Sequence, residues 1–332
     1  MIQWFKIRKH FVGEWEETCL QTLSTVGLLG LGGVGAVYAK HLHETLGPRF
    51  YALLDRGRQG RYRQSGVFVN DERVDFAYLD PADCSAPLDL VLVAVKGTQL
   101  TSALQTLAPC IGPGTVLLCL QNGVSSEAIA RAMYPQAHVP YAFVVGIDTL
   151  RTGTRVDVKG QGRIVCGDDV NDPPTALLCR VQQLLCSAGI ACEIPRDMRH
   201  AQWWKFMMNC ALNQLCAIRR VPYGGFIHDV HIRALAQKVC EEVAAVGSFE
   251  GVSLTQDDMA CMFNTIATFS ADGQPSMLQD VLAQRETEVE LFAGTVMRLA
   301  QRHDMDAPYA TALYHLLCSI QQAYAADVSH CV

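Results

Sequence analysis

The sequence predicts an α/β protein in which a doubly wound parallel sheet is followed by an all-α domain. Two observations indicate the sheet: a glycine-rich turn directly after a short apolar run, and further apolar runs separated by helical patterns. Continuous apolar runs are typical of parallel strands covered on both faces, and strand–helix alternation favours right-handed crossovers. From about residue 197 onward, long helical periods follow one another without a convincing strand, which indicates the helical domain.

The predicted elements follow each other in order. The run 25–29 is the first strand, the turn 30–35 opens a helix that Gly47 ends, and 49–56 is the second strand. Further strands are predicted at 89–95, 115–120, 138–147, 154–158, 162–167 and 190–194, with helices at 98–109, 125–134 and 175–189. We therefore expect an N-terminal extension, a dinucleotide-binding domain and an all-helical substrate domain, at residues 1–24, 25–196 and 197–332.

Composition excludes several classes of partner. Half of the 332 residues are hydrophobic, 18% are charged, and the net charge is −6 without a Lys/Arg-rich run. This argues against nucleic acid or an anionic membrane as a partner, and no apolar run approaches the ~20 residues of a membrane span. The 14 cysteines contain no Cys-x-x-Cys spacing, so reduced thiols are expected and no metal site. We expect a soluble cytoplasmic protein, and the oligomeric state stays open, a homodimer included.

The turn GLGGVG predicts dinucleotide binding. Its glycines at 30, 32 and 35 form G-x-G-x-x-G between a strand and a helix, the context in which this motif is informative. The first glycine permits the tight turn, the second lets the backbone approach a pyrophosphate, and the third packs helix on strand. The N–H groups at the helix N-terminus then hold the phosphate. The predicted binding residues are Gly30, Leu31, Gly32, Gly33, Val34 and Gly35.

The end of the second predicted strand bears on the choice of cofactor. Asp55 stands where an acid would hold a ribose 2′-hydroxyl, and Arg56 stands where an arginine would accept a 2′-phosphate. Successive strand residues point to opposite sides, so only one of the two would face the adenosine. Arg58 and Arg61 add positive charge to the same turn, which favours Arg56 and NADPH, while Asp55 leaves NADH open.

Other polar residues are ambiguous on spacing alone. Lys96 and Asn122 each follow an apolar strand, where ligands of open α/β sheets lie, but a solvated lysine and an Asn-Gly turn are equally ordinary there. Ser276 begins an S-x-x-Q pattern, so it is a helix cap or a ligand. Three glutamates alternate along what we take as the following helix, and periodicity does not choose among Glu286, Glu288 and Glu290.

The stretch WWKFMMNCALNQL carries the most specific signal. Lys205, Asn209 and Asn213 recur every fourth residue, so on a helix they share one slowly drifting stripe, surrounded by apolar side chains. Lys205 alone could extend to water with its stem on apolar surface. Three polar residues in register favour a polar ligand, and a buried ammonium needs a carboxylate or an anionic ligand nearby.

Seven segments together resemble the ketopantoate reductase (2-dehydropantoate 2-reductase) family, from about residue 25 to about residue 320. They are GLGGVG, the strand-end Arg56, VAVKGTQ, LQNG, WWKFMMNCALNQLCAI, VCEEVAAV and SMLQDVLAQRETEVE. The resemblance implies an N-terminal Rossmann domain, a helical C-terminal domain, and an active site in the cleft between them. It implies NADPH-dependent reduction of a small α-keto acid, ketopantoate, to pantoate, a step of pantothenate and coenzyme A biosynthesis.

The resemblance also implies roles for the ambiguous residues. The implied catalytic residues are Lys205, as general acid, and Glu288. The implied cofactor contacts outside the glycine-rich turn are Arg56, Lys96 and Asn122, and the implied substrate contacts are Asn122, Asn209, Asn213 and Ser276. Tyr223 is a departure, because the family often carries an asparagine at that place, which puts the edge of the pocket in doubt.

Two other readings compete with this one. The first is another two-domain reductase, such as an opine-type or hydroxyacid-type dehydrogenase, which shares G-x-G-x-x-G but not the lysine helix together with SMLQD. The second is a non-catalytic dinucleotide sensor whose closure signals to a partner. Lys205 and Glu288 speak against a sensor, because binding alone needs neither.

Overall fold

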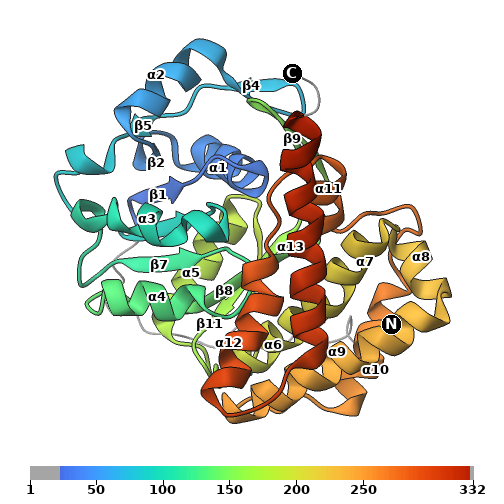
Figure 1. Ribbon diagram of the computed structural model, residues 1–332. Helices are drawn as coiled ribbons and strands as arrows, with labels where there is room; N and C mark the ends of the chain where they lie inside the picture. The colour runs from blue at the N-terminus through green and yellow to red at the C-terminus, as the bar shows by residue number, and fades with distance from the viewer. Residues whose placement is uncertain (1–22, 330–332) are drawn as a thin grey trace.

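The computed structural model describes residues 23–329, and it consists of an α/β half followed by a helical half. In Figure 1 the strands belong to the blue-to-green part of the chain, and the yellow-to-red part is built from helices. Among the described residues, every strand ends by Glu193, and from Met198 onward the regular elements are all helical. Residues 1–22 of the expected N-terminal extension lie outside the described residues. No helix in the described part of the chain is long and apolar enough to cross a bilayer.

The first sheet carries the predicted parallel topology. Its five strands run in the order β5-β2-β1-β6-β7, and every neighbouring pair is parallel. The central strands are fully buried, as their continuous apolar sequences predict. The strands are β1 (Val26–Leu29), β2 (Phe50–Leu53), β5 (Tyr78–Leu79), β6 (Leu90–Val93) and β7 (Val116–Cys119). The helices of this half are α1 (Gly33–Leu46), α2 (Arg56–Ser65), α3 (Leu100–Gln105), α4 (Ser126–Met133) and α5 (Ala176–Ser187).

Two smaller mixed sheets complete the α/β half. Their strand orders are β4-β3-β10-β9 and β12-β11-β8. The strands are β3 (Val67–Val69), β4 (Glu72–Val74), β8 (Tyr141–Val145), β9 (Asp148–Thr152), β10 (Arg155–Lys159), β11 (Arg163–Gly167) and β12 (Ala191–Glu193). Sequence patterns missed β3, β4, β5 and β9, because these strands are short or, like β9, almost wholly exposed and polar.

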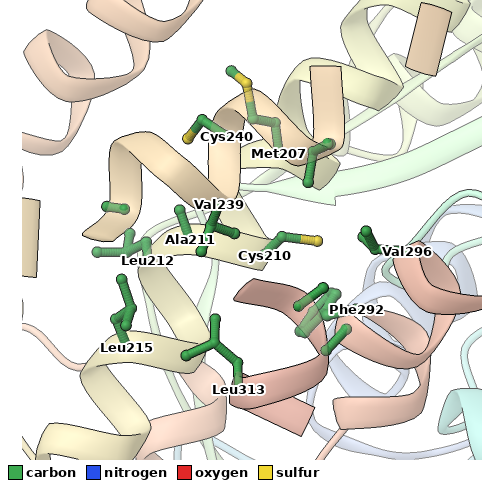
Figure 2. Close-up of a cluster of buried hydrophobic side chains, with 14 of the residues drawn as sticks. Met207, Cys210, Ala211, Leu212, Leu215, Val239, Cys240, Phe292, Val296 and Leu313 are labelled. Atoms are coloured by element: carbon green, nitrogen blue, oxygen red, sulfur yellow. The ribbon is translucent and has the colours of Figure 1, made fainter. Parts of the chain in front are cut away.

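The helical half is organised around the polar-striped segment. That segment comprises α6 (Met198–Met208), a π-helical turn η5 (Asn209–Asn213) and α7 (Gln214–Arg219). Its apolar face joins a core cluster in which Met207, Cys210 and Leu212 pack with side chains of other helices, as Figure 2 shows. The remaining helices are α8 (Tyr223–His228), α9 (Val230–Phe249), α10 (Gln256–Ile266), α11 (Ser276–Leu282), α12 (Ala293–Arg302) and α13 (Pro308–Ser329).

Local signals in this half are confirmed where they concern helix ends. The first long helical segment ends before Pro222, and α8 begins directly after it. Thr255 and Asp258 form the expected reciprocal capping box at the start of α10. The short-range pattern therefore placed these two helix boundaries correctly.

Candidate active site

The glycine-rich turn has the geometry that a dinucleotide requires. Gly30 has a φ of +102°, which strongly favours glycine, and a Cβ at Gly35 would lie 1.9 Å from the carbonyl oxygen of Gly30. A Cβ at Gly32, the residue preceding α1, would meet nothing closer than 3.8 Å. The space above Gly32 is thus open to a ligand, beside the N–H groups at the start of α1. These residues fit a bound pyrophosphate.

Thr149 is a neighbour of this turn that sequence reasoning did not identify. A Cβ at Gly33 would lie 2.3 Å from its side-chain oxygen, so β9 packs directly against the start of α1. The hydroxyl therefore stands beside the helix N-terminus, within the region suited to a phosphate. No local pattern marks Thr149, because the strand that carries it is exposed and polar.

The expected placement of Asp55 and Arg56 at a strand end is wrong. Strand β2 ends at Leu53, Asp55 is the N-cap of α2, and Arg56 is the first residue of that helix. The Asp55 carboxylate accepts a hydrogen bond from the Arg58 amide at 2.9 Å and pairs with the Arg58 side chain, whose hydrogen bond holds the pKa of Asp55 below its usual value. The alternation argument therefore does not apply to this pair.

Arg56 is held by an acidic residue of another loop. Its Nη2 donates to Asp83 Oδ1 at 2.6 Å, and its side chain is 77% exposed. The guanidinium thus stands in solvent next to β2, with part of its donor capacity used by Asp83. Arg56 makes no hydrogen bond to the residues of the lysine cluster described next; its hydrogen-bond partners are Asp80 and Asp83.

Lys205 lies at the junction of the two halves. It is 9% exposed, and its Nζ donates to the Val144 carbonyl of β8 at 2.6 Å and to Asn122 Oδ1 at 3.0 Å. The same Nζ lies 5.2 Å from the centre of the Phe143 ring. Burial lowers the pKa of Lys205 to about 8, and the negative charge of Glu288 opposes that shift. A lysine in this state can exchange a proton near neutral pH.

Glu288 is joined to Lys205 through Asn122. The Asn122 amide nitrogen donates to Glu288 Oε2 at 2.9 Å, while its oxygen accepts from the lysine. Burial raises the pKa of Glu288, and the hydrogen bond from Asn122 opposes this shift. The expected helix for the three glutamates is wrong: Glu288 lies in a loop before η6 (Val289–Leu291), while Glu286 and Glu290 are exposed.

Lys96 belongs to the same neighbourhood. It precedes η3 (Gly97–Gln99) after β6, and its Nζ donates to the Glu286 carbonyl at 3.3 Å and lies 3.9 Å from Asp280 Oδ1. A Cβ at Gly97 would meet the Leu291 side chain at 2.3 Å, so this loop packs closely against η6. The strand-end lysine and the glutamate loop therefore meet across the two halves.

The two asparagines of the stripe occupy the π-helical turn. Asn209 and Asn213 are 6% and 7% exposed, and their side chains make no hydrogen bond to another described residue. The side-chain amide atoms of both residues are not fully buried, so each keeps some contact with solvent. Isolated π-turns inside helices are frequent at functional sites. The two amides are free to bind a polar ligand.

Ser276 does not serve as the helix cap that its sequence pattern allowed. Pro275 occupies the N-cap position, no side chain caps α11, and Ser276 is the exposed first residue of the helix. Gln279 instead donates to Asp148 Oδ1 at 3.2 Å, which ties α11 to β9. Helix α11 also packs against η5 and α7, so the serine belongs to a helix that borders the asparagine turn.

Buried groups behind the lysine were also missed by sequence reasoning. Glu127 is 1% exposed, and its Oε1 accepts hydrogen bonds from the Ala142 amide of β8 and from Gln202 of α6, both at 3.1 Å. It thus joins the strand that supplies the Val144 carbonyl to the helix that carries Lys205. A single glutamate in an amphipathic helix gives no sequence signal for such a role.

Two family models match the chain. The model described as "Ketopantoate reductase PanE/ApbA" matches residues 26–171, and "Ketopantoate reductase PanE/ApbA C terminal" matches residues 197–321. A curated relative, the 2-dehydropantoate 2-reductase of Vibrio cholerae, is 28% identical over 240 residues, which are 71% of this chain and 79% of the relative.

Solved structures repeat the fold. A PanE/ApbA family ketopantoate reductase from Ralstonia eutropha JMP134 is 26% identical, with a TM-score of 0.79 over 91% of this chain and 99% of that one. A dimeric ketopantoate reductase from Staphylococcus aureus is 22% identical, with a TM-score of 0.75 over 90% and 99%. D-mandelate dehydrogenase with NADH and anilino(oxo)acetate is 19% identical, with a TM-score of 0.80 over 91% and 99%. The last two show similarity of fold alone.

Proposed function

The chain belongs to the ketopantoate reductase family of oxidoreductases, and we propose that it reduces ketopantoate to pantoate with NADPH. Residues 25–196 would bind the dinucleotide, and residues 197–332 would supply the substrate-binding and catalytic side chains. The observation that carries the proposal is the hydrogen-bonded chain from Lys205 through Asn122 to Glu288. It joins a strand end of the first half to a buried helix and a loop of the second.

The chemistry follows from this arrangement. When bound, the reduced nicotinamide supplies a hydride to C2 of the keto acid. The carbonyl oxygen then needs a proton, and the Lys205 ammonium polarises the carbonyl and donates that proton as general acid. Glu288 favours the charged form of the lysine, since its carboxylate raises the lysine pKa. Asn122 orients both groups through its two hydrogen bonds.

The remaining polar residues are assigned to binding. Asn209 and Asn213 have unengaged amides that suit the carboxylate and hydroxyl of ketopantoate. Ser276 begins α11, the helix that borders the π-helical turn. The turn 30–35 would hold the pyrophosphate, with Lys96 as a further cofactor contact and Arg56 at the 2′-phosphate. The open space at Gly32 and the exposed guanidinium of Arg56 support these two assignments.

The decisive test is turnover with a panel of α-keto acids, each offered with NADPH and with NADH, followed by the absorbance of the reduced cofactor. Ketopantoate with NADPH should give the highest kcat/KM. Tight cofactor binding without turnover on any keto acid would favour a dinucleotide sensor and overturn the proposal.

A second candidate is reduction of a different α-keto acid with NADH. Two features favour it: the similarity in fold to a D-mandelate dehydrogenase bound to NADH, and the aromatic Tyr223 where the family often carries an asparagine. Tyr223 is partly buried against Phe269, with 5.1 Å between ring centres. An aromatic keto acid that outperforms ketopantoate in the same panel would select this candidate.

We further propose a homodimer in a reducing compartment, the cytoplasm. A dimeric relative of the same fold supports the first expectation. The described cysteines, all of them free thiols, support the second. Light scattering coupled to size-exclusion chromatography tests the dimer, and a monomeric mass at micromolar concentration would contradict it.

A further inference from the structure

A pocket apart from the candidate active site lies between the two halves, and it is lined by none of the residues given a role under the proposed function. It encloses about 320 Å³, and its walls come from α4 and β8 on one side and from α6, the end of α9 and α12 on the other. Three arginines line it, Arg131, Arg199 and Arg302, together with a single carboxylate, Glu250. The walls therefore carry an excess of positive charge.

The single carboxylate is already paired. Glu250 Oε1 accepts from Arg302 and lies 2.7 Å from His303 Nε2. Arg131 and Arg199 form no ion pair with any carboxylate in the described part of the chain. Arg131 donates to the Val139 carbonyl at 2.7 and 3.0 Å, and Arg199 donates to the Glu250 carbonyl at 2.8 Å. Neither guanidinium thus has a carboxylate within ion-pair distance.

A neighbouring buried acid, Glu127, interacts electrostatically with Arg131 but makes no ion pair with it, and burial raises the pKa of this acid to about 7. Glu127 lies on the same helix as Arg131, but it is 1% exposed and does not line the pocket. Its Oε1 accepts hydrogen bonds from the Ala142 amide and from the Gln202 side chain. The acid is therefore turned toward the protein interior, behind the pocket wall.

The guanidiniums of Arg131 and Arg199 both lie near one aromatic ring. The Cζ atoms of Arg131 and Arg199 lie 4.2 and 5.9 Å from the centre of the Tyr141 ring. Cation–π contact of this kind fixes a guanidinium without using its N–H donors. Two positive charges near one ring repel each other, which destabilises the folded protein. An anion bound between them would offset this repulsion.

We propose that this pocket binds a phosphate monoester, with its dianionic phosphate held by Arg131 and Arg199. Guanidinium donors match phosphate oxygens in geometry, and the two positive charges match a dianion. The hydroxyl of Ser125 on the wall offers a further donor, whereas the Thr295 hydroxyl already donates to the Glu290 carbonyl at 3.1 Å. A volume of about 320 Å³ is larger than inorganic phosphate needs and lies at the small end of metabolite sites. A small phosphorylated metabolite is the class of ligand that fits.

The test is calorimetric titration of the full chain with glycerol 3-phosphate, inorganic phosphate and glycerol at constant ionic strength. Glycerol 3-phosphate should bind saturably, inorganic phosphate more weakly, and glycerol not at all. Arg199→Gln should weaken binding about tenfold to a hundredfold, the loss expected for charged hydrogen bonds. Arg302→Gln tests the pocket rim if Arg199→Gln fails to fold. The matched control is Arg298→Gln, an arginine of the same helix as Arg302 that is also paired with a glutamate but does not line the pocket.

Three outcomes would overturn the proposal: no saturable heat with glycerol 3-phosphate, equal affinity in wild type and Arg199→Gln, or equal losses in Arg199→Gln and Arg298→Gln. Affinity lost in Arg56→Gln but kept in Arg199→Gln would also overturn it, because the phosphate would then occupy the dinucleotide site. The readout is binding and not turnover, so a failure of the proposed reductase activity would not affect it.

Discussion

The ammonium of Lys205 lies 3.0 Å from the amide oxygen of Asn122, whose nitrogen in turn donates to Glu288. The side-chain amide of Asn122 therefore bridges the lysine and the glutamate. Their charges affect each other's pKa, since Glu288 raises that of Lys205 and Lys205 lowers that of Glu288. The site thus keeps a buried ammonium charged without engaging it in a tight ion pair, so its proton stays available.

Lys205→Ala should lower kcat and kcat/KM together, by about 10²–10⁴-fold, because a general acid acts in the transition state. Asn209→Ala should act more through KM, since an amide that orients the substrate contributes to binding in the ground state as well. Steady-state kinetics with ketopantoate and NADPH measures both. A wild-type kcat in Lys205→Ala would contradict the assignment of the proton donor.

The pH dependence of reduction should reflect the lysine pKa of about 8. Only the protonated lysine can donate a proton, so kcat/KM for reduction should fall as pH rises through about 8. Oxidation of pantoate needs the neutral lysine as a base, so kcat/KM for oxidation should rise in the same pH range. Glu288→Gln removes the charge that raises this pKa, and the alkaline limb should move to lower pH. An alkaline limb that stays in place in Glu288→Gln would mean that another group titrates.

Glu288→Gln should also reduce turnover strongly, whereas Glu286→Gln is a matched control. Both residues lie in the same loop, but Glu286 is exposed and only its backbone carbonyl is engaged, by Lys96. Glu290 is a poorer control, because its carboxylate binds Arg298 and Tyr314. Equal and small effects of the two substitutions on turnover would contradict a catalytic role for Glu288.

The cofactor preference should depend on Arg56 and its partner. Wild type should show a higher kcat/KM for NADPH than for NADH, and Arg56→Ala should remove most of the difference. Asp83→Asn should increase the preference for NADPH, because it frees the guanidinium and removes a negative charge near the 2′-phosphate. A wild type that prefers NADH, with NADH binding weakened in Asp55→Ala, would identify Asp55 as the residue that selects the cofactor.

Ionisation of Glu127 should make the protein less stable at neutral pH than at mildly acidic pH. Burial raises its pKa from 4.5 to about 7, so the folded state binds this proton more tightly and stability declines as pH rises from about 4.5 to about 7. The full cost above that range is roughly 3 kcal/mol. Glu127→Gln keeps an acceptor for the Ala142 amide and should raise the free energy of unfolding at pH ~8, with little change at pH ~5. Urea denaturation at both pH values measures this, and an equal change at both would contradict the linkage.

The sequence determined the features that depend on near neighbours in the chain. The buried strands follow from apolar runs, and the turn 30–35 follows from its glycines. The spacing of Lys205, Asn209 and Asn213 predicted a helix, but it did not predict the π-helical turn at Asn209–Asn213. Helix breaks at Pro222 and the cap at Thr255 are local in the same sense. Each is decided within a few residues by backbone sterics, capping or period, so no tertiary information was needed.

Tertiary structure decided which of the polar residues meet. Lys205 finds its acceptors 61 and 83 residues away, and Asn122 binds a carboxylate 166 residues away. The segment expected to be a glutamate-bearing helix is instead a loop, packed against the other half, in which Glu288 points inward. Arg56 forms an ion pair with Asp83 from another segment. Period and propensity describe a segment's own conformation, whereas these pairings depend on how the crossovers bring distant segments together and on which charges burial forces to find partners.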